Sequence, residues 1–158
     1  MKPSEFDEGQ LFHSIAVSGA RALLIGRQAL IALGIPVLTR DYDYWIHIDD
    51  IAPFNQAVSP LGFAPNRSDD EARARGRYVL ENDERIDVLV ARSVSTVGGV
   101  RVAFEDVWLR RQRLELSPGI EVQLPSIEDL ILTKQFGGRP KDAEDLRLLR
   151  ELLRGGTT

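Results

Sequence analysis

Residues 22–48, which read ALLIGRQALIALGIPVLTRDYDYWIHI, contain the pattern on which the fold depends. Ala22 to Gly26 is a short, continuous apolar run that ends in glycine, which is typical of a strand buried on both faces. We therefore expect this strand to be central in its sheet. Residues 27–33 are good helix formers and are followed by Gly34, a usual signal for the end of a helix. The segment predicts a strand and a short helix that meet at Gly26.

Residues 41–48 follow as a second predicted strand, because aromatic and β-branched residues are interleaved with polar ones. Side chains two residues apart on a strand point to the same face, so the carboxylates of Asp41 and Asp43 should project together, roughly 6.6–6.8 Å apart along the chain. Two anions at this spacing favour a hard divalent cation, such as magnesium, between them. The alternative is a solvated strand edge, where such aspartate pairs are common.

Asp87 is a third candidate, because it lies in the otherwise apolar segment 86–90 of the predicted strand 85–91. An unpaired carboxylate is costly to bury, so Asp87 needs a partner. A metal ion is one candidate partner, and a salt bridge to Arg85 or Arg40 is the alternative. The turn at Gly26 and the helix after it could offer backbone N–H groups to a phosphate beside that metal.

The rest of the chain predicts helices and further strands around this unit. Helices are expected over residues 8–20, from the Asp49–Asp50 cap to Val58, and over 105–113, 126–136 and 141–153; strands are expected over 77–80, 85–91, 100–104 and 120–124. Strands 77–80 and 85–91 are predicted to pair across a polar turn, with 100–104 as a further antiparallel member of the same sheet.

The composition limits the class of protein. A chain of 158 residues fits one domain, taken as residues 1–158, and its 43% hydrophobic and 28% charged residues are ordinary for a globular protein. The absence of cysteine excludes disulfides, thiolate ligands and a cysteine nucleophile. The net charge of -4 gives no electrostatic footprint for duplex nucleic acid, although local basic patches could still contact RNA. Neither a signal peptide nor a membrane span is apparent, so we expect a cytoplasmic protein.

Other chemistries have little support in the sequence. His13 and His47 lack the spacing of a zinc site, and His47 is expected to face solvent from its strand. The chain contains no nucleophile elbow and no Walker-type lysine. Tyr42 and Tyr44 are interpreted as packing residues, with stacking on a base at a pocket mouth as the alternative.

The motifs, in this order, resemble the nucleotidyltransferase superfamily, in particular the small stand-alone prokaryotic members related to toxin–antitoxin and abortive-infection nucleotidyltransferases. The matching segments are residues 24–29 (LIGRQA) with Gly34, 39–43 (TRDYD), 86–89 (IDVL), 125–131 (PSIEDLI) with Lys134, and 139–142 (RPKD) with Asp145 and Leu146. The likeness extends from about Ala22 to Leu149.

The resemblance implies an α/β (α+β) fold, a minimal mixed sheet flanked by helices with two helices at the C-terminus. It also implies a metal-dependent enzyme that moves a nucleoside monophosphate from a nucleoside triphosphate such as ATP to an acceptor hydroxyl on RNA, a protein or a small molecule, with magnesium or manganese as cofactor. The catalytic and metal-binding residues it implies are Asp41, Asp43 and Asp87. The nucleotide-binding residues it implies are Gly26, Arg27, Gln28, Arg40, Lys134, Arg139 and Lys141.

One residue departs from the family pattern. The family's turn usually continues with a second small residue, whereas this chain has Arg27 after Gly26. Arg27 could bind phosphate through its planar guanidinium, or it could block the pocket. A non-catalytic nucleotide-binding or antitoxin-like interaction module on the same fold is therefore the alternative function, and a structural domain whose carboxylates are all salt-bridged is a third.

Overall fold

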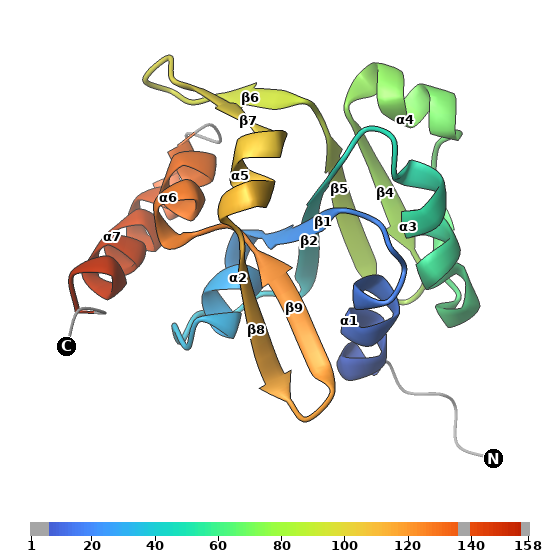
Figure 1. Ribbon diagram of the computed structural model, residues 1–158, viewed down its shortest axis with the longest axis horizontal. Helices are drawn as coiled ribbons and strands as arrows, with labels where there is room; N and C mark the ends of the chain where they lie inside the picture. Colours follow the sequence, from blue (N-terminus) through green and yellow to red (C-terminus); the bar gives the residue numbers. More distant parts are fainter. Residues whose placement is uncertain (1–6, 136–139, 156–158) are drawn as a thin grey trace.

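The computed structural model describes residues 7–135 and 140–155 and has an α+β architecture around a five-stranded mixed sheet (Figure 1). In spatial order the strands are β1 (Ala22–Ile25), β2 (Asp41–Ile46), β5 (Arg85–Val90), β4 (Arg77–Glu81) and β3 (Ala64–Pro65). Strands β2 and β5 run parallel, whereas the other neighbouring pairs are antiparallel. The mixed sheet flanked by helices that was expected is confirmed.

Helices and two small hairpins surround the sheet. The helices are α1 (Glu8–Ala16), α2 (Gly26–Ala32), α3 (Ile51–Val58), α4 (Asp69–Arg75), α5 (Phe104–Arg110), α6 (Ile127–Gln135) and α7 (Pro140–Gly155), with a 3-10 turn at Ser59–Leu61. The hairpins are β6 (Ser93–Ser95) with β7 (Arg101–Ala103), and β8 (Gln112–Ser117) with β9 (Ile120–Leu124). Figure 1 shows α6 and α7 on the side of the molecule that carries α2, and α1, α3 and α4 on the other. None of the described helices is long and apolar enough to span a bilayer.

The alternation along β2 separates the two faces of the sheet. Tyr42, Tyr44 and Ile46 are buried in the main core, which confirms that the two tyrosines are packing residues. Trp45 lies on the opposite face, in a second and smaller apolar cluster. Because side chains alternate along a strand, Asp41 and Asp43 share that second face with Trp45, towards the beginning of β2. The core therefore holds one end of this face, and the carboxylates occupy the other.

Strand β1 lies at an edge of the sheet, so its predicted central position is wrong. All four of its residues are nevertheless buried, because Leu24 packs in the main core and Leu23 in the smaller cluster, with β9 beside the strand. A continuous apolar run indicates that both faces are covered, which an edge strand also satisfies when helices and a hairpin surround it.

Two further differences concern residues 93–117. The strand at residues 101–103 pairs with residues 93–95 in a separate hairpin, so its predicted place in the main sheet is wrong. The reason is local, because Gly99 has a φ of +83° and closes a tight turn in which the N–H of Thr96 bonds the carbonyl of Val100 at 2.8 Å. The helix expected to reach residue 113 ends at Arg110, and β8 follows it.

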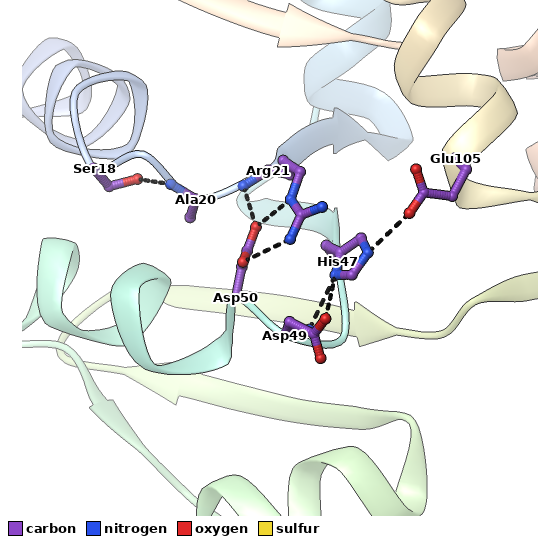
Figure 2. Close-up of polar contacts among 7 residues, drawn as sticks. All are labelled: Ser18, Ala20, Arg21, His47, Asp49, Asp50 and Glu105. Atoms are coloured by element: carbon purple, nitrogen blue, oxygen red, sulfur yellow. Dashed lines mark hydrogen bonds and ion pairs between the residues drawn. The ribbon is translucent and has the colours of Figure 1, made fainter.

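A polar cluster closes the end of the sheet opposite to the paired aspartates (Figure 2). Arg21 donates through Nε and Nη2 to the two carboxylate oxygens of Asp50, at 2.8 and 3.1 Å. The Nδ1 atom of His47 accepts the backbone N–H of Asp49 at 3.1 Å, and its Nε2 lies 3.0 Å from Oε1 of Glu105. The imidazole is thus buried rather than facing solvent as predicted, because Phe104 and Glu105 of α5 contact it. This cluster fixes the turn after β2 and leaves the beginning of the strand available for a site.

Candidate functional site

A pocket of about 760 Å³ lies over the sheet where β2 and β5 begin. Its lining includes the three aspartates that the sequence singled out, Asp41, Asp43 and Asp87. The register pairs Asp41 with Arg85, and Asp43 with Asp87. Directly paired residues on parallel strands project to the same face, so three carboxylates and one guanidinium occupy four adjacent positions.

The resident cation at these four positions is Arg85. Asp43 and Asp87 are direct neighbours across two strands, where like charges repel each other. The guanidinium of Arg85 donates to Asp87 at N–O distances of 3.0, 3.2 and 3.3 Å, which is the salt bridge considered as the alternative partner of Asp87. This hydrogen bond raises the pKa of Arg85. The side chains are 51% and 30% exposed, so the pair should contribute only about 0–1 kcal/mol.

The carboxylates fit a hard divalent cation by their donor chemistry. Magnesium and manganese prefer carboxylate oxygens, and Asp41, Asp43 and Asp87 present them on one face of the sheet. No group of three His, Asp or Glu side chains within residues 7–135 and 140–155 already stands in a metal-binding arrangement. Binding therefore requires the side chains to turn towards the ion, and it requires Arg85 to leave Asp87. The metal site at these residues stays a prediction.

Gly26 brings the turn after β1 directly against Asp43. Its φ is +69°, a conformation that favours glycine. A Cβ at this position would lie 2.5 Å from Oδ2 of Asp43, which no side chain could tolerate without a shift. Ile25, the residue before the turn, is paired with Asp43 in the sheet register. The backbone of the turn therefore stands next to the carboxylate face, as a phosphate-binding turn beside a metal requires.

Arg27 has two contacts with the protein itself. Its Nε and Nη2 atoms each donate to one oxygen of Asp145 on α7 at 3.2 Å, and its Nη1 donates to the carbonyl of Leu38 at 3.1 Å. Arg27 also lines the pocket. It therefore links the turn to the loop before β2 and to the last helix. This structural role comes in addition to the two roles that its position suggested, which were binding a phosphate and blocking the pocket.

Asp145 is buried between two cations. Its side chain is 0% exposed, and its Oδ2 lies 2.9 Å from Nζ of Lys134, which is itself 3.6 Å from Oδ1 of Asp142. Burial alone would raise the pKa of Asp145, but hydrogen bonds from Lys134 and Arg27 outweigh it and lower that pKa. Lys134, a predicted phosphate contact, is thus buried and paired with carboxylates instead of exposed on a helix. It still lines the pocket.

We expect Asp145→Asn to lower the free energy of unfolding by about 3–5 kcal/mol at neutral pH, because Lys134 loses the nearer of its two buried counter-charges and Arg27 loses its carboxylate partner. The folded pKa of Asp145 lies below the unfolded value of about 3.9, so this contribution is complete above that pH and is lost as the pH falls. Urea unfolding from pH 7 to pH 3 measures it, with the exposed Asp106→Asn as the control. A difference between variant and wild type that does not shrink towards pH 3 contradicts the assignment.

Two other predicted nucleotide contacts whose side chains the structure describes, Gln28 and Arg40, do not line this pocket. Gln28 is buried in α2 and does not line it. Arg40 is exposed and lines a smaller neighbouring pocket beside residues 81–85. Lys141 belongs to α7, and Arg139 lies outside the described residues.

The sequence did not predict three residues that line the pocket on the side of β4 and β3, away from the turn at Gly26. Arg77 on β4, with Asn66 and Arg67 after β3, lines the pocket beside Asp87. Arg77 could have been found, because it shares a strand face with Val79 and Glu81 on the strand predicted to pair with that of Asp87. Arg67 lies in a loop without periodicity, and only the fold brings it to the pocket.

Comparison with known proteins identifies this arrangement as a known fold. No family model and no curated protein matches the chain. A protein from Thermotoga maritima, provisionally assigned as a nucleotidyltransferase, matches with a TM-score of 0.60 at 14% identity, over 90% of this chain and 89% of that chain. The antibiotic-resistance factor ANT(2'')-Ia matches with a TM-score of 0.63 at 18% identity, over 92% of this chain and 84% of that chain. The lincosamide antibiotic adenylyltransferase LnuA, in its lincomycin-bound form, matches with a TM-score of 0.61 at 14% identity, over 93% of this chain and 98% of that chain.

Proposed function

We propose that this chain, whose fold is that of the nucleotidyltransferase superfamily, transfers a nucleoside monophosphate from a nucleoside triphosphate to an acceptor hydroxyl. The observation that carries the proposal is the single sheet face on which Asp41, Asp43 and Asp87 meet the turn at Gly26. ATP is the donor we propose, because one structural neighbour is named an adenylyltransferase.

Each part of the site has a task in this reaction. Asp41, Asp43 and Asp87 would hold magnesium or manganese, which when bound neutralises charge on the triphosphate and on the leaving pyrophosphate. Gly26 itself adds no side chain between a phosphate and the backbone N–H groups of the turn, and Arg27 lines the pocket next to it. Arg85 would offer its guanidinium to phosphate oxygens once it leaves Asp87. The contribution of the protein is mainly to fix these groups relative to one another on two strands and one turn.

We expect Arg85→Gln to tighten binding of Mn²⁺ in the absence of nucleotide by about threefold to tenfold, because the ion no longer has to displace a guanidinium from Asp87. Electron paramagnetic resonance titration of free Mn²⁺ measures the affinity. The matched control is Arg40→Gln, an exposed arginine next to Asp41 in the sequence that has no contact with Asp87 in the structure. If Arg85→Gln binds Mn²⁺ no better than wild type, Arg85 is not the competing cation.

The direct test of the function is transfer of a label. Purified protein, magnesium and a cell extract are incubated with triphosphates labelled either at the α-phosphate or at the γ-phosphate. The proposal expects an acceptor to be labelled only from the α-position, since the nucleoside monophosphate moves and the pyrophosphate leaves. Label from the γ-position would instead identify a kinase-type transfer and reject the proposal.

A non-catalytic module, antitoxin-like or nucleotide-binding, is the second candidate. The observation in its favour is Arg27, which stands where the family has a small residue and is bonded to Asp145 and to the Leu38 carbonyl. Calorimetry with ATP and magnesium separates the two candidates. Tight binding without transfer, or co-purification with a partner protein, favours the module.

A further inference from the structure

The order of the strands indicates from which side an acceptor reaches the site. The turn at Gly26 stands on the β1 side of the carboxylates, and Arg77 stands on the β4 side. In phosphoryl-type transfer, the attacking and leaving oxygens lie roughly in line on opposite sides of the phosphorus. With the leaving pyrophosphate against the turn, as the proposed function requires, the acceptor hydroxyl approaches from the β4 side.

The β4 side of the pocket is basic and is built by the sheet. Val79 is the register partner of Asp87, and Arg77 lies two residues before it on the same face of β4. Asn66 is fixed to Val79 by two hydrogen bonds of 2.9 Å, one in each direction, and this places Arg67 beside the strand. Both arginines line the same pocket as Asp87.

These two guanidiniums have no carboxylate partner in the part of the chain that the structure describes. Neither Arg67 nor Arg77 takes part in an ion pair or a side-chain hydrogen bond there, although Arg67 acts on Glu71 at longer range. In this they differ from Arg27, Lys134 and Arg85, which line the same pocket but are each paired with an aspartate. Two cations that face a pocket without a counter-ion create a positive potential that attracts an anion.

We propose that Arg67 and Arg77 form the acceptor subsite, and that the acceptor carries a phosphate next to its reacting hydroxyl. The inference rests on the proposed function. The acceptor oxygen forms a bond to the α-phosphorus, the bond from that phosphorus to the oxygen bridging to the β-phosphate breaks, and pyrophosphate leaves with the electron pair while the hydroxyl proton passes to water. A planar guanidinium binds two oxygens of a phosphate at once, whereas a cationic acceptor would be repelled. The 3′ end of an RNA strand and a small sugar phosphate both have this chemistry.

The experiment compares wild type with the double variant Arg67→Gln and Arg77→Gln, using direct binding. The first probe is a fluorescent single-stranded RNA oligonucleotide, measured by anisotropy over a range of salt concentrations. We expect binding at least tenfold weaker in the double variant, with a log–log salt slope shallower by about 1.4, since each lost contact with a single strand removes about 0.7. The matched control, Arg75→Gln, changes an exposed arginine of α4 outside the pocket and should bind as wild type.

The second probe, ribose 5-phosphate measured by calorimetry, distinguishes the two sources of the phosphate. Arginine-dependent binding of RNA assigns the subsite to a nucleic-acid end, and arginine-dependent binding of ribose 5-phosphate without RNA binding assigns it to a small acceptor. Equal binding by the double variant and wild type, or no binding of either probe to wild type, overturns the proposal.

The affinity for ATP with Mn²⁺ separates this inference from the function on which it rests. We expect that affinity to stay within about twofold in the double variant, because both arginines lie on the acceptor side. If wild type transfers no α-label and yet shows arginine-dependent anion binding, the transferase assignment fails while the anion subsite stands. Loss of ATP affinity in the double variant would instead place the arginines on the nucleotide side and overturn the acceptor assignment.

Discussion

Replacement of Asp41 and Asp43 together by asparagine should abolish transfer of α-labelled nucleotide, with a fall in rate of at least about a thousandfold. The two residues lie on one face of β2 at the pocket, and Asp43 stands opposite Asp87. Asparagine keeps the size of each side chain but removes two of the three negative charges, so Asp87 alone remains to attract a doubly charged cation. Binding of Mn²⁺ should be lost together with activity.

The control for this variant is Asp106→Asn, which removes an exposed carboxylate on α5 away from the pocket. Its transfer rate should equal that of wild type. Thermal unfolding of the double variant should lie near the wild-type value, because removing the repulsion between Asp43 and Asp87 offsets lost polar contacts. Transfer that persists in the folded double variant ends the catalytic assignment.

Gly26→Ala should produce the second-largest effect, with binding of Mn²⁺ weakened at least tenfold and transfer slowed by about a hundredfold or more. The new methyl group would lie 2.5 Å from Oδ2 of Asp43, so either the turn or the carboxylate has to move. A displacement of this kind at a reacting centre costs on the order of a hundredfold in rate. Because alanine is strained at a positive φ, the substitution also lowers the free energy of unfolding by about 1–2 kcal/mol.

Gly34→Ala is the matched control, because it isolates the backbone penalty from the steric one. Gly34 has a φ of +89°, and a Cβ there would meet nothing within 4 Å. Both variants should therefore lose a similar free energy of unfolding from the positive φ, but only Gly26→Ala should lose Mn²⁺ binding and transfer. Equal activity of the two variants would show that the contact with Asp43 is not important to the site.

The sequence was informative where side-chain periodicity follows one strand. The alternation in the predicted strand of residues 41–48 predicted the shared face of Asp41 and Asp43, and the interpretation of Tyr42 and Tyr44 as packing residues is confirmed. The glycine at the end of an apolar run predicted the turn at Gly26. In each case a local pattern is sufficient, because neighbouring residues alone decide which face a side chain occupies.

Properties that depend on long-range pairing could not be obtained in this way. The edge position of β1 depends on which strands pair with β2. The burial of His47 depends on α5, which lies far along the chain. The ion network of Asp145 with Arg27 and Lys134 likewise joins three helices that no spacing connects. Helix α4 was not predicted, although a local pattern in the sequence indicates it. Ser68 and Glu71 form a capping box at its N-terminus, and this motif can be recognised from the sequence alone.

Asp43 and Asp87 face each other across the parallel pair of the sheet, and this has a consequence for folding kinetics. Parallel neighbours cannot be joined by a tight hairpin, so the chain between them must complete the crossover through α3, α4 and β4 before the two carboxylates meet. Loop-closure entropy opposes this step until the long-range pairing forms. A truncated or partially refolded chain that ends before β5 should therefore contain the aspartate pair of β2 without its third member, and high-affinity Mn²⁺ binding should appear only with the complete sheet.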